Sequence, residues 1–189
     1  MVKIASALQG AVISQDVGPA YASSRLGQRF AVAHATPGTG ILSPSTAYDD
    51  EKPTFLFQQT GKDKRVILSR MYLVQTGTVA GGPISIAVII DSVIRRASAG
   101  TLVTPKATNM AAAGAAGVSF YTLPTAVATT VTERVVAQSA AAKLVGTVTD
   151  IDFGDGIMID GTGSILVYAW AGTTAPTWTF FFEIIEETL

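Results

Sequence analysis

Apolar and β-branched residues gather from Thr54 onward in runs of strand length, separated by segments rich in Gly, Pro and Thr. Runs of this length and composition predict β-strands. The predicted strands are Thr54–Gln59, Val66–Gln75, Ile84–Asp91, Val118–Leu123, Val131–Ala137, Leu144–Asp150, Ile157–Ile159, Ser164–Ala171 and Thr177–Glu186. Their number and spacing indicate an all-β fold, an antiparallel two-sheet β-sandwich of jelly-roll-like arrangement.

Turn-forming residues divide these strands. The run Gly61-Lys62-Asp63-Lys64 predicts a hairpin between the first two strands, and Asp155-Gly156 predicts another turn. We expect a long loop over Lys106–Gly117, with a short helix as the alternative because the segment is rich in Ala. The same alternative applies to Ala137–Lys143.

Residues 1–53 differ from the rest in texture, because Gly and Pro recur among Ser, Ala and Thr. This segment nevertheless holds apolar residues such as Ile13, Phe30 and Ile41, more than a solvated tail needs. We therefore expect an N-terminal arm over residues 1–53 that lies against its own domain or a neighbour. The β-sandwich domain then covers residues 54–189.

Charged residues are scarce, which changes the picture of the surface. They make up 14% of the chain, whereas soluble domains average about 25%. A surface of Ala, Ser, Thr and Gly favours association with other subunits, so we expect a homo-oligomer. The net charge of −1 offers no basic surface for nucleic acid, and no segment has the length of a membrane span. The chain holds no Cys, which excludes disulfides and cysteine nucleophiles.

Two places hold residues that could carry chemistry. His34 is the only histidine, and neither a Gly-x-Ser-x-Gly elbow nor another catalytic pattern accompanies it, so we expect it to pack against a neighbour. Asp150, Asp152 and Asp155 form an acidic, Gly-containing loop of the kind that binds calcium. Their spacing does not match an EF-hand, and the favoured interpretation is two strand-end residues and a turn.

The remaining charged candidates favour structural interpretations. Glu183, Glu186 and Glu187 lie near the C-terminus and are expected to be exposed. The run Gly61-Lys62 lacks the earlier glycine of a phosphate-binding loop. Arg95-Arg96 follows a hydrophobic strand, as residues that guard against aggregation do. We expect no catalytic, cofactor-binding or metal-binding residues and no enzyme activity.

Trp170 and Trp178 flank a loop, and paired aromatic rings beside a loop can stack on a sugar. They can equally cover the end of a sandwich core. Glycan binding is therefore an alternative function.

The order of features resembles small structural proteins of tailed bacteriophages. The resemblance rests on Arg25-Leu26-Gly27-Gln28-Arg29-Phe30 and on Pro53-Thr54-Phe55-Leu56-Phe57-Gln58-Gln59-Thr60-Gly61-Lys62, followed by strand-rich Ala/Thr/Gly sequence. It implies a virion component, a capsid decoration or cement protein on the surface of the shell, assembled in the host cytoplasm. Its partners would be the major capsid protein or other virion proteins, with trimers favoured. The alternative is a module of the tail or fibre that binds a host glycan or another virion protein.

Overall fold

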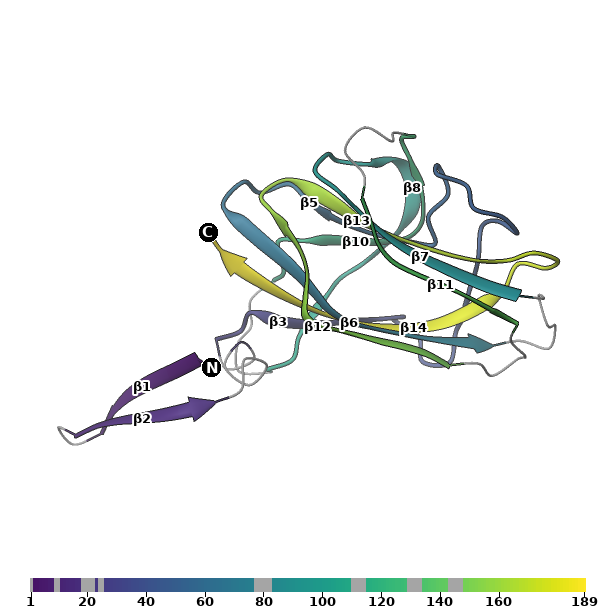
Figure 1. Ribbon diagram of the computed structural model, residues 1–189. Helices are drawn as coiled ribbons and strands as arrows, with labels where there is room; N and C mark the ends of the chain where they lie inside the picture. Colours follow the sequence, from purple (N-terminus) through teal and green to yellow (C-terminus); the bar gives the residue numbers. More distant parts are fainter. Residues whose placement is uncertain are drawn as a thin grey trace.

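The computed structural model describes residues 2–8, 11–17, 23, 26–76, 83–109, 115–128, 134–142 and 148–189. The elements along these ranges are β-strands (Figure 1). They are β1 (Val2–Leu8), β2 (Ala11–Val17), β3 (Arg29–Ala33), β4 (Ile41–Leu42), β5 (Phe55–Gln59), β6 (Lys64–Thr76), β7 (Pro83–Asp91), β8 (Arg96–Val103), β9 (Lys106–Ala107), β10 (Ser119–Ala126), β11 (Arg134–Ala142), β12 (Val148–Asp160), β13 (Gly163–Ala171) and β14 (Thr177–Thr188).

Two antiparallel sheets pack face to face. The first sheet has the strand order β11-β7-β13-β5-β10-β8, and the second has the order β12-β6-β14-β3-β9, with β4 also paired to β14. The predicted all-β two-sheet sandwich is confirmed, whereas the jelly-roll arrangement stays a prediction. Figure 1 shows the two layers edge-on, with β14 and β6 in the lower layer and β13 and β7 in the upper one.

Aromatic residues fill the space between the sheets. Phe55, Phe57 and Phe120 of the first sheet face Phe180 and Phe182 of the second, with ring centroids 4.8 to 5.6 Å apart across the sheets. Strand β14 alternates buried and half-buried positions along almost its whole length, as a strand with one covered face does. Strand β13 is buried at nearly every position, which accounts for its unbroken apolar run.

A second apolar cluster lies on the outer face of the first sheet. It includes Leu56, Ile89, Leu166 and Tyr168. The chain before β5 covers part of this face, because the Tyr48 ring packs on Tyr168 at 5.0 Å. The Tyr168 hydroxyl also donates a hydrogen bond to the carbonyl of Asp50 at 2.9 Å.

The segment predicted as an arm contributes strands. Strand β3 pairs with β14, and its Phe30 and Val32 are buried in the core. Strand β4 pairs with β14 at Thr177 and Trp178. Strands β1 and β2 pair only with each other among the described strands. The sandwich therefore begins at β3 instead of at Thr54. The sequence did not predict β3, because the apolar alternation of residues 29–33 is too short to identify a strand in a segment rich in Gly and Pro.

Two predictions made from turn residues are wrong: the hairpin between the first two strands and the turn at Asp155-Gly156. Strands β5 and β6 do not form a hairpin, because residues 60–63 carry the chain from the first sheet to the second. Residues 148–160 form the single strand β12, with a register shift between Asp152 and Ile157 in place of a turn. Gly156 lies in this bulge with a φ of 88°, and a Cβ there would approach Ile67 Cγ2 to 2.2 Å. Turn residues predict a change of direction without saying whether the flanking strands pair.

Four further sequence predictions concern segments that the structure describes in part. In the predicted loop over residues 106–117, residues 106–107 form β9, and residues 110–114 lie outside the described ranges. Residues 137–142 are part of β11, so a helix there is excluded. The starts of two predicted strands, at residues 131–133 and 144–147, lie outside the described ranges.

Candidate functional site

His34 lies just beyond β3, half-buried, and no nucleophile partners it among the described residues. Its Nδ1 accepts a hydrogen bond from the backbone N–H of Thr36 at 3.1 Å. Its ring stands edge-on to Phe180, with centroids 6.3 Å apart. The surroundings are those of a packing residue.

The acidic loop is part of β12, and its carboxylates are engaged. Asp150 accepts two hydrogen bonds from Arg70, at 2.9 and 2.6 Å, and these bonds hold the pKa of Asp150 below its ordinary value. Asp152 accepts a hydrogen bond from the backbone N–H of Gly154 at 2.8 Å. The side chain of Asp155 lies outside what the structure describes. In the described part of the chain, no three His, Asp or Glu residues converge as metal ligands do.

The C-terminal glutamates were predicted to be exposed, and for Glu186 this is wrong. Glu186 is only 6% exposed. Its carboxylate accepts hydrogen bonds from the backbone N–H groups of Gly117 at 2.6 Å and Val118 at 3.0 Å, and from the Lys64 ammonium at 3.0 Å. The hydrogen bond to Glu186 raises the pKa of Lys64. Through these hydrogen bonds, the Glu186 carboxylate joins the backbone before β10 to the end of β14.

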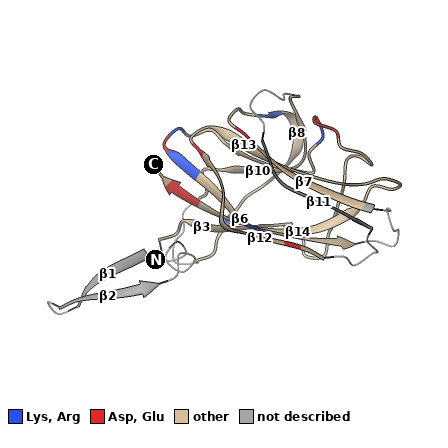
Figure 2. Cartoon of the chain, viewed as in Figure 1, with Lys and Arg blue, Asp and Glu red and all other residues tan. Residues whose placement is uncertain are grey.

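The other two glutamates also lie on β14 and contact arginines. Glu183 pairs with Arg29 of β3. Glu187 is more exposed and lies 3.7 Å from the Arg65 guanidinium. Figure 2 shows that charged residues gather where β6 begins and β14 ends, whereas the strands elsewhere are mostly uncharged.

Arg95 was predicted to guard against aggregation at a strand end, and this is wrong because its side chain is fully buried. Its guanidinium binds Asp91 at 3.2 Å, whose side chain is also fully buried, and Asp50 at 2.8 Å. Its Nε donates to the carbonyl of Val127. The arginine thus joins the end of β7, the segment before β5 and the end of β10.

Arg96 occupies a different environment. Its guanidinium lies 4.1 Å from the ring centre of Tyr121 and donates a hydrogen bond to the carbonyl of Ala99 at 2.8 Å. It marks the start of β8, as a residue that guards an edge strand would.

The two tryptophans lie in different sheets and do not present a common surface. Trp178 is fully buried in the core, and its Nε1 donates to the Ser43 hydroxyl at 2.8 Å. Trp170 lies in the other sheet, half-buried, where its ring packs against Tyr48 at 5.8 Å. The interpretation that Trp178 covers the core is confirmed.

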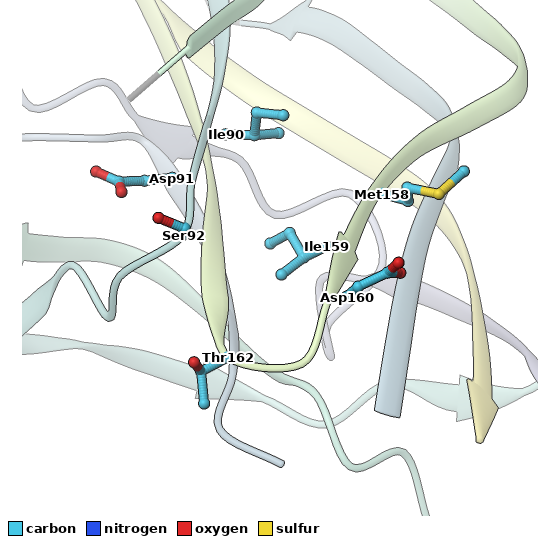
Figure 3. Close-up of a pocket in the computed structure, with 7 residues that line it drawn as sticks. All are labelled: Ile90, Asp91, Ser92, Met158, Ile159, Asp160 and Thr162. Atoms are coloured by element: carbon cyan, nitrogen blue, oxygen red, sulfur yellow. The ribbon is translucent and has the colours of Figure 1, made fainter. Parts of the chain in front are cut away.

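A hollow of about 280 Å³ lies between the end of β7 and the end of β12 (Figure 3). It is lined by Ile90, Asp91, Ser92, Met158, Ile159, Asp160 and Thr162. The two carboxylates point away from each other. Asp91 binds Arg95, and Asp160 binds Arg65, which lowers the pKa of Asp160. They do not face a common site, as the pair of a glycosidase must.

Strand β8 forms an exposed and uncharged edge of the first sheet. Among the described strands, β8 pairs only with β10. Every residue from 97 to 102 is exposed, and Leu102 is 56% exposed. After Arg96 the strand carries no charge and no Pro. Backbone groups on such an edge are open to pairing with another strand, and proteins that stay monomeric normally protect them with charges or Pro.

A groove of about 640 Å³ lies beside this edge, between the two sheets. Its lining comes from residues 31–41 on one side and residues 101–106 on the other, with Thr122. Most of these residues are apolar or uncharged, and His34 and Lys106 supply the titratable groups. Strand β3 borders the side of the groove opposite β8, and it pairs with β9 only at Phe30 and Ala31. The groove thus lies between two strand edges that have unpaired positions among the described strands.

The backbone at this edge is held in unusual conformations. Ala99 and Leu123, on neighbouring strands, have φ values of 53° and 51°. Such conformations cost about 1–3 kcal/mol each and persist where the surrounding structure imposes them. A Cβ at the neighbouring Gly100 would approach Pro124 Cα to 2.9 Å. The packing of β8 on β10 therefore requires glycine at this position.

Sequence reasoning missed this edge because Arg96–Val103 has no apolar alternation. The sequence feature that could have identified this edge is the uncharged run Ala97–Val103 directly after an arginine.

In the described ranges, no helix has the length and apolar character to cross a membrane. Comparison with protein-family models, curated proteins and solved structures gives no match to this chain.

Proposed function

We propose that this chain is a structural subunit of a virus particle, a decoration or cement protein that binds the outside of a capsid shell in many identical copies. The observation that carries the proposal is the uncharged, exposed edge of β8, which among the described strands pairs only with β10 and lies beside an apolar groove. A surface of this kind is open to association. A protein that works as one of many copies needs such a surface to associate with its neighbours.

The distribution of charge supports the same role. A group of charged side chains lies where β6 begins and β14 ends, and most of them are paired with each other (Figure 2). With 14% charged residues in the whole chain, the surface is weakly charged, which favours burial against identical or different subunits. The resemblance of the 25–30 and 53–62 segments to structural proteins of tailed phages supports placement in a virion.

A non-enzymatic role agrees with the contacts of the acidic residues. Asp150, Asp160 and Glu186 each bind a basic side chain, and Asp152 accepts a backbone hydrogen bond. Carboxylates held in this way stabilise the fold. The Asp152→Asn variant should therefore keep its assembly behaviour.

Electron microscopy of the parent particle, labelled with an antibody against this chain, tests the proposal. Regular labelling over the shell is the expected result. Labelling at the tail or fibres would support the alternative module. Particles that carry no copy of the chain would refute both.

A further inference from the structure

We propose that the hairpin of β1 and β2 from one copy adds to the β8 edge of a second copy and covers the groove beside it. This inference rests on the proposed function, because it supplies the contact by which the copies associate. It extends the first sheet across the subunit boundary by strand addition, a common mode of recognition.

The acceptor is the β8 edge. Residues 97–102 are exposed, and the side of β8 away from β10 has no partner among the described strands. Thr101 and Val103 pair with Thr122 and Phe120 and therefore share the face of the sheet that turns toward the core. A strand added beside β8 would place alternate residues over the groove.

The donor is the hairpin, which pairs with neither sheet. Its register places Val2 opposite Val17, Ile4 opposite Gln15, Ser6 opposite Ile13 and Leu8 opposite Ala11, so these mainly apolar pairs share one face. Lys3 and Asp16 are paired positions on the opposite face of the hairpin backbone. A two-stranded hairpin is marginally stable alone in water, so we expect it to pair with a further strand.

The two parts match in length and in number. Strands β1 and β2 each have 7 residues, and β8 has 8. Donor and acceptor lie on the same chain, so every copy supplies one of each. A contact between different surfaces of identical copies forms a ring when the rotation between copies closes, and an open filament when it does not. The trimer expected from the sequence would be such a ring.

Cross-linking between separately prepared variants tests the contact, and the absence of natural Cys makes the readout clean. One preparation carries Ala5→Cys in the hairpin, and the other carries Ser98→Cys on β8 together with an affinity tag. The two are mixed and treated with a short bismaleimide. The control acceptor is Met158→Cys, which is 43% exposed on β12, at the far edge of the second sheet.

We expect the mixed Ala5–Ser98 product to exceed the Ala5–Met158 product by at least about fivefold, because a bound strand raises the effective concentration of its neighbours. Equal yields from both acceptors would overturn the proposal. Cross-linking confined within single chains of an Ala5→Cys/Ser98→Cys double variant would also overturn it, since the hairpin would then cover its own copy.

A second pair of variants gives an independent result. Thr101→Lys places a charge at the groove and should weaken association by at least about tenfold. Thr173→Lys makes the same change at an exposed loop position and should leave association unchanged. Equal association of the two variants would refute the proposal. If the unsubstituted chain is monomeric by light scattering, the proposed function fails; if it is oligomeric without the Ala5–Ser98 product, only this inference fails.

Discussion

Replacement of Arg95 with methionine tests whether the buried ionic contacts hold the sandwich together. The guanidinium is fully buried and binds two carboxylates, of which Asp91 is also fully buried. Methionine fills most of the volume without the charge. The change therefore leaves the Asp91 carboxylate in the interior without its arginine.

The expected cost follows from this burial. Removal of one partner of a buried ion pair costs about 3–5 kcal/mol, because a buried charge loses its compensation. For a chain of this length, that corresponds to a fall in Tm of roughly 6–20 °C. The double variant Arg95→Met/Asp91→Asn removes the uncompensated charge and keeps an acceptor for the Val93 N–H, which donates to Asp91 at 3.1 Å. It should regain about 2 kcal/mol.

Urea denaturation followed by circular dichroism measures these free energies of unfolding. Arg96→Met is the matched control, because this neighbouring arginine lies at the surface over Tyr121. Its loss should cost less than about 1 kcal/mol. An Arg95→Met variant as stable as the Arg96→Met control, or a double variant no more stable than the single one, would refute the reasoning.

Three further predictions concern single side chains. Glu186→Gln should lower the free energy of unfolding by about 1–3 kcal/mol, since the buried carboxylate accepts two backbone hydrogen bonds. In the same urea titration, the control Glu187→Gln should change the free energy of unfolding by less than about 0.5 kcal/mol. Trp170→Phe leaves Trp178 as the only tryptophan, and the tryptophan emission should be blue-shifted and resist quenching by iodide; strong quenching would contradict its burial. The lowered pKa of Asp160 means that its contribution to stability is complete above the ordinary carboxyl pKa and is lost as the pH falls through the lower folded value; acid titration of Asp160→Asn should show a smaller loss below about pH 4.

The buried strands could be predicted from the sequence, whereas the exposed strand β8 and the short strand β3 could not. The apolar runs that became β5, β6, β7, β10, β13 and β14 coincide with the predicted segments to within a few residues. Strand β8 is exposed on both faces, so it carries no alternation to detect. Strand β3 is short and lies in Gly-rich sequence, although Phe30 and Val32 are core residues.

The candidate site was harder to predict, because it depends on contacts between distant residues. Arg95 and Arg96 are adjacent in sequence, yet one is fully buried between Asp50 and Asp91 and the other lies over a tyrosine ring. Glu186 is buried only because the backbone before β10 returns to it. No pattern along the chain encodes which carboxylate will meet which partner.

The mass of the full chain in solution, measured by light scattering across a range of concentrations, tests most directly the claim that this protein works by association of identical copies. We predict a closed oligomer, with three times the chain mass of 19.6 kDa favoured, which dissociates in the Thr101→Lys variant and not in the Thr173→Lys variant. A mass of one chain at every concentration would contradict the account.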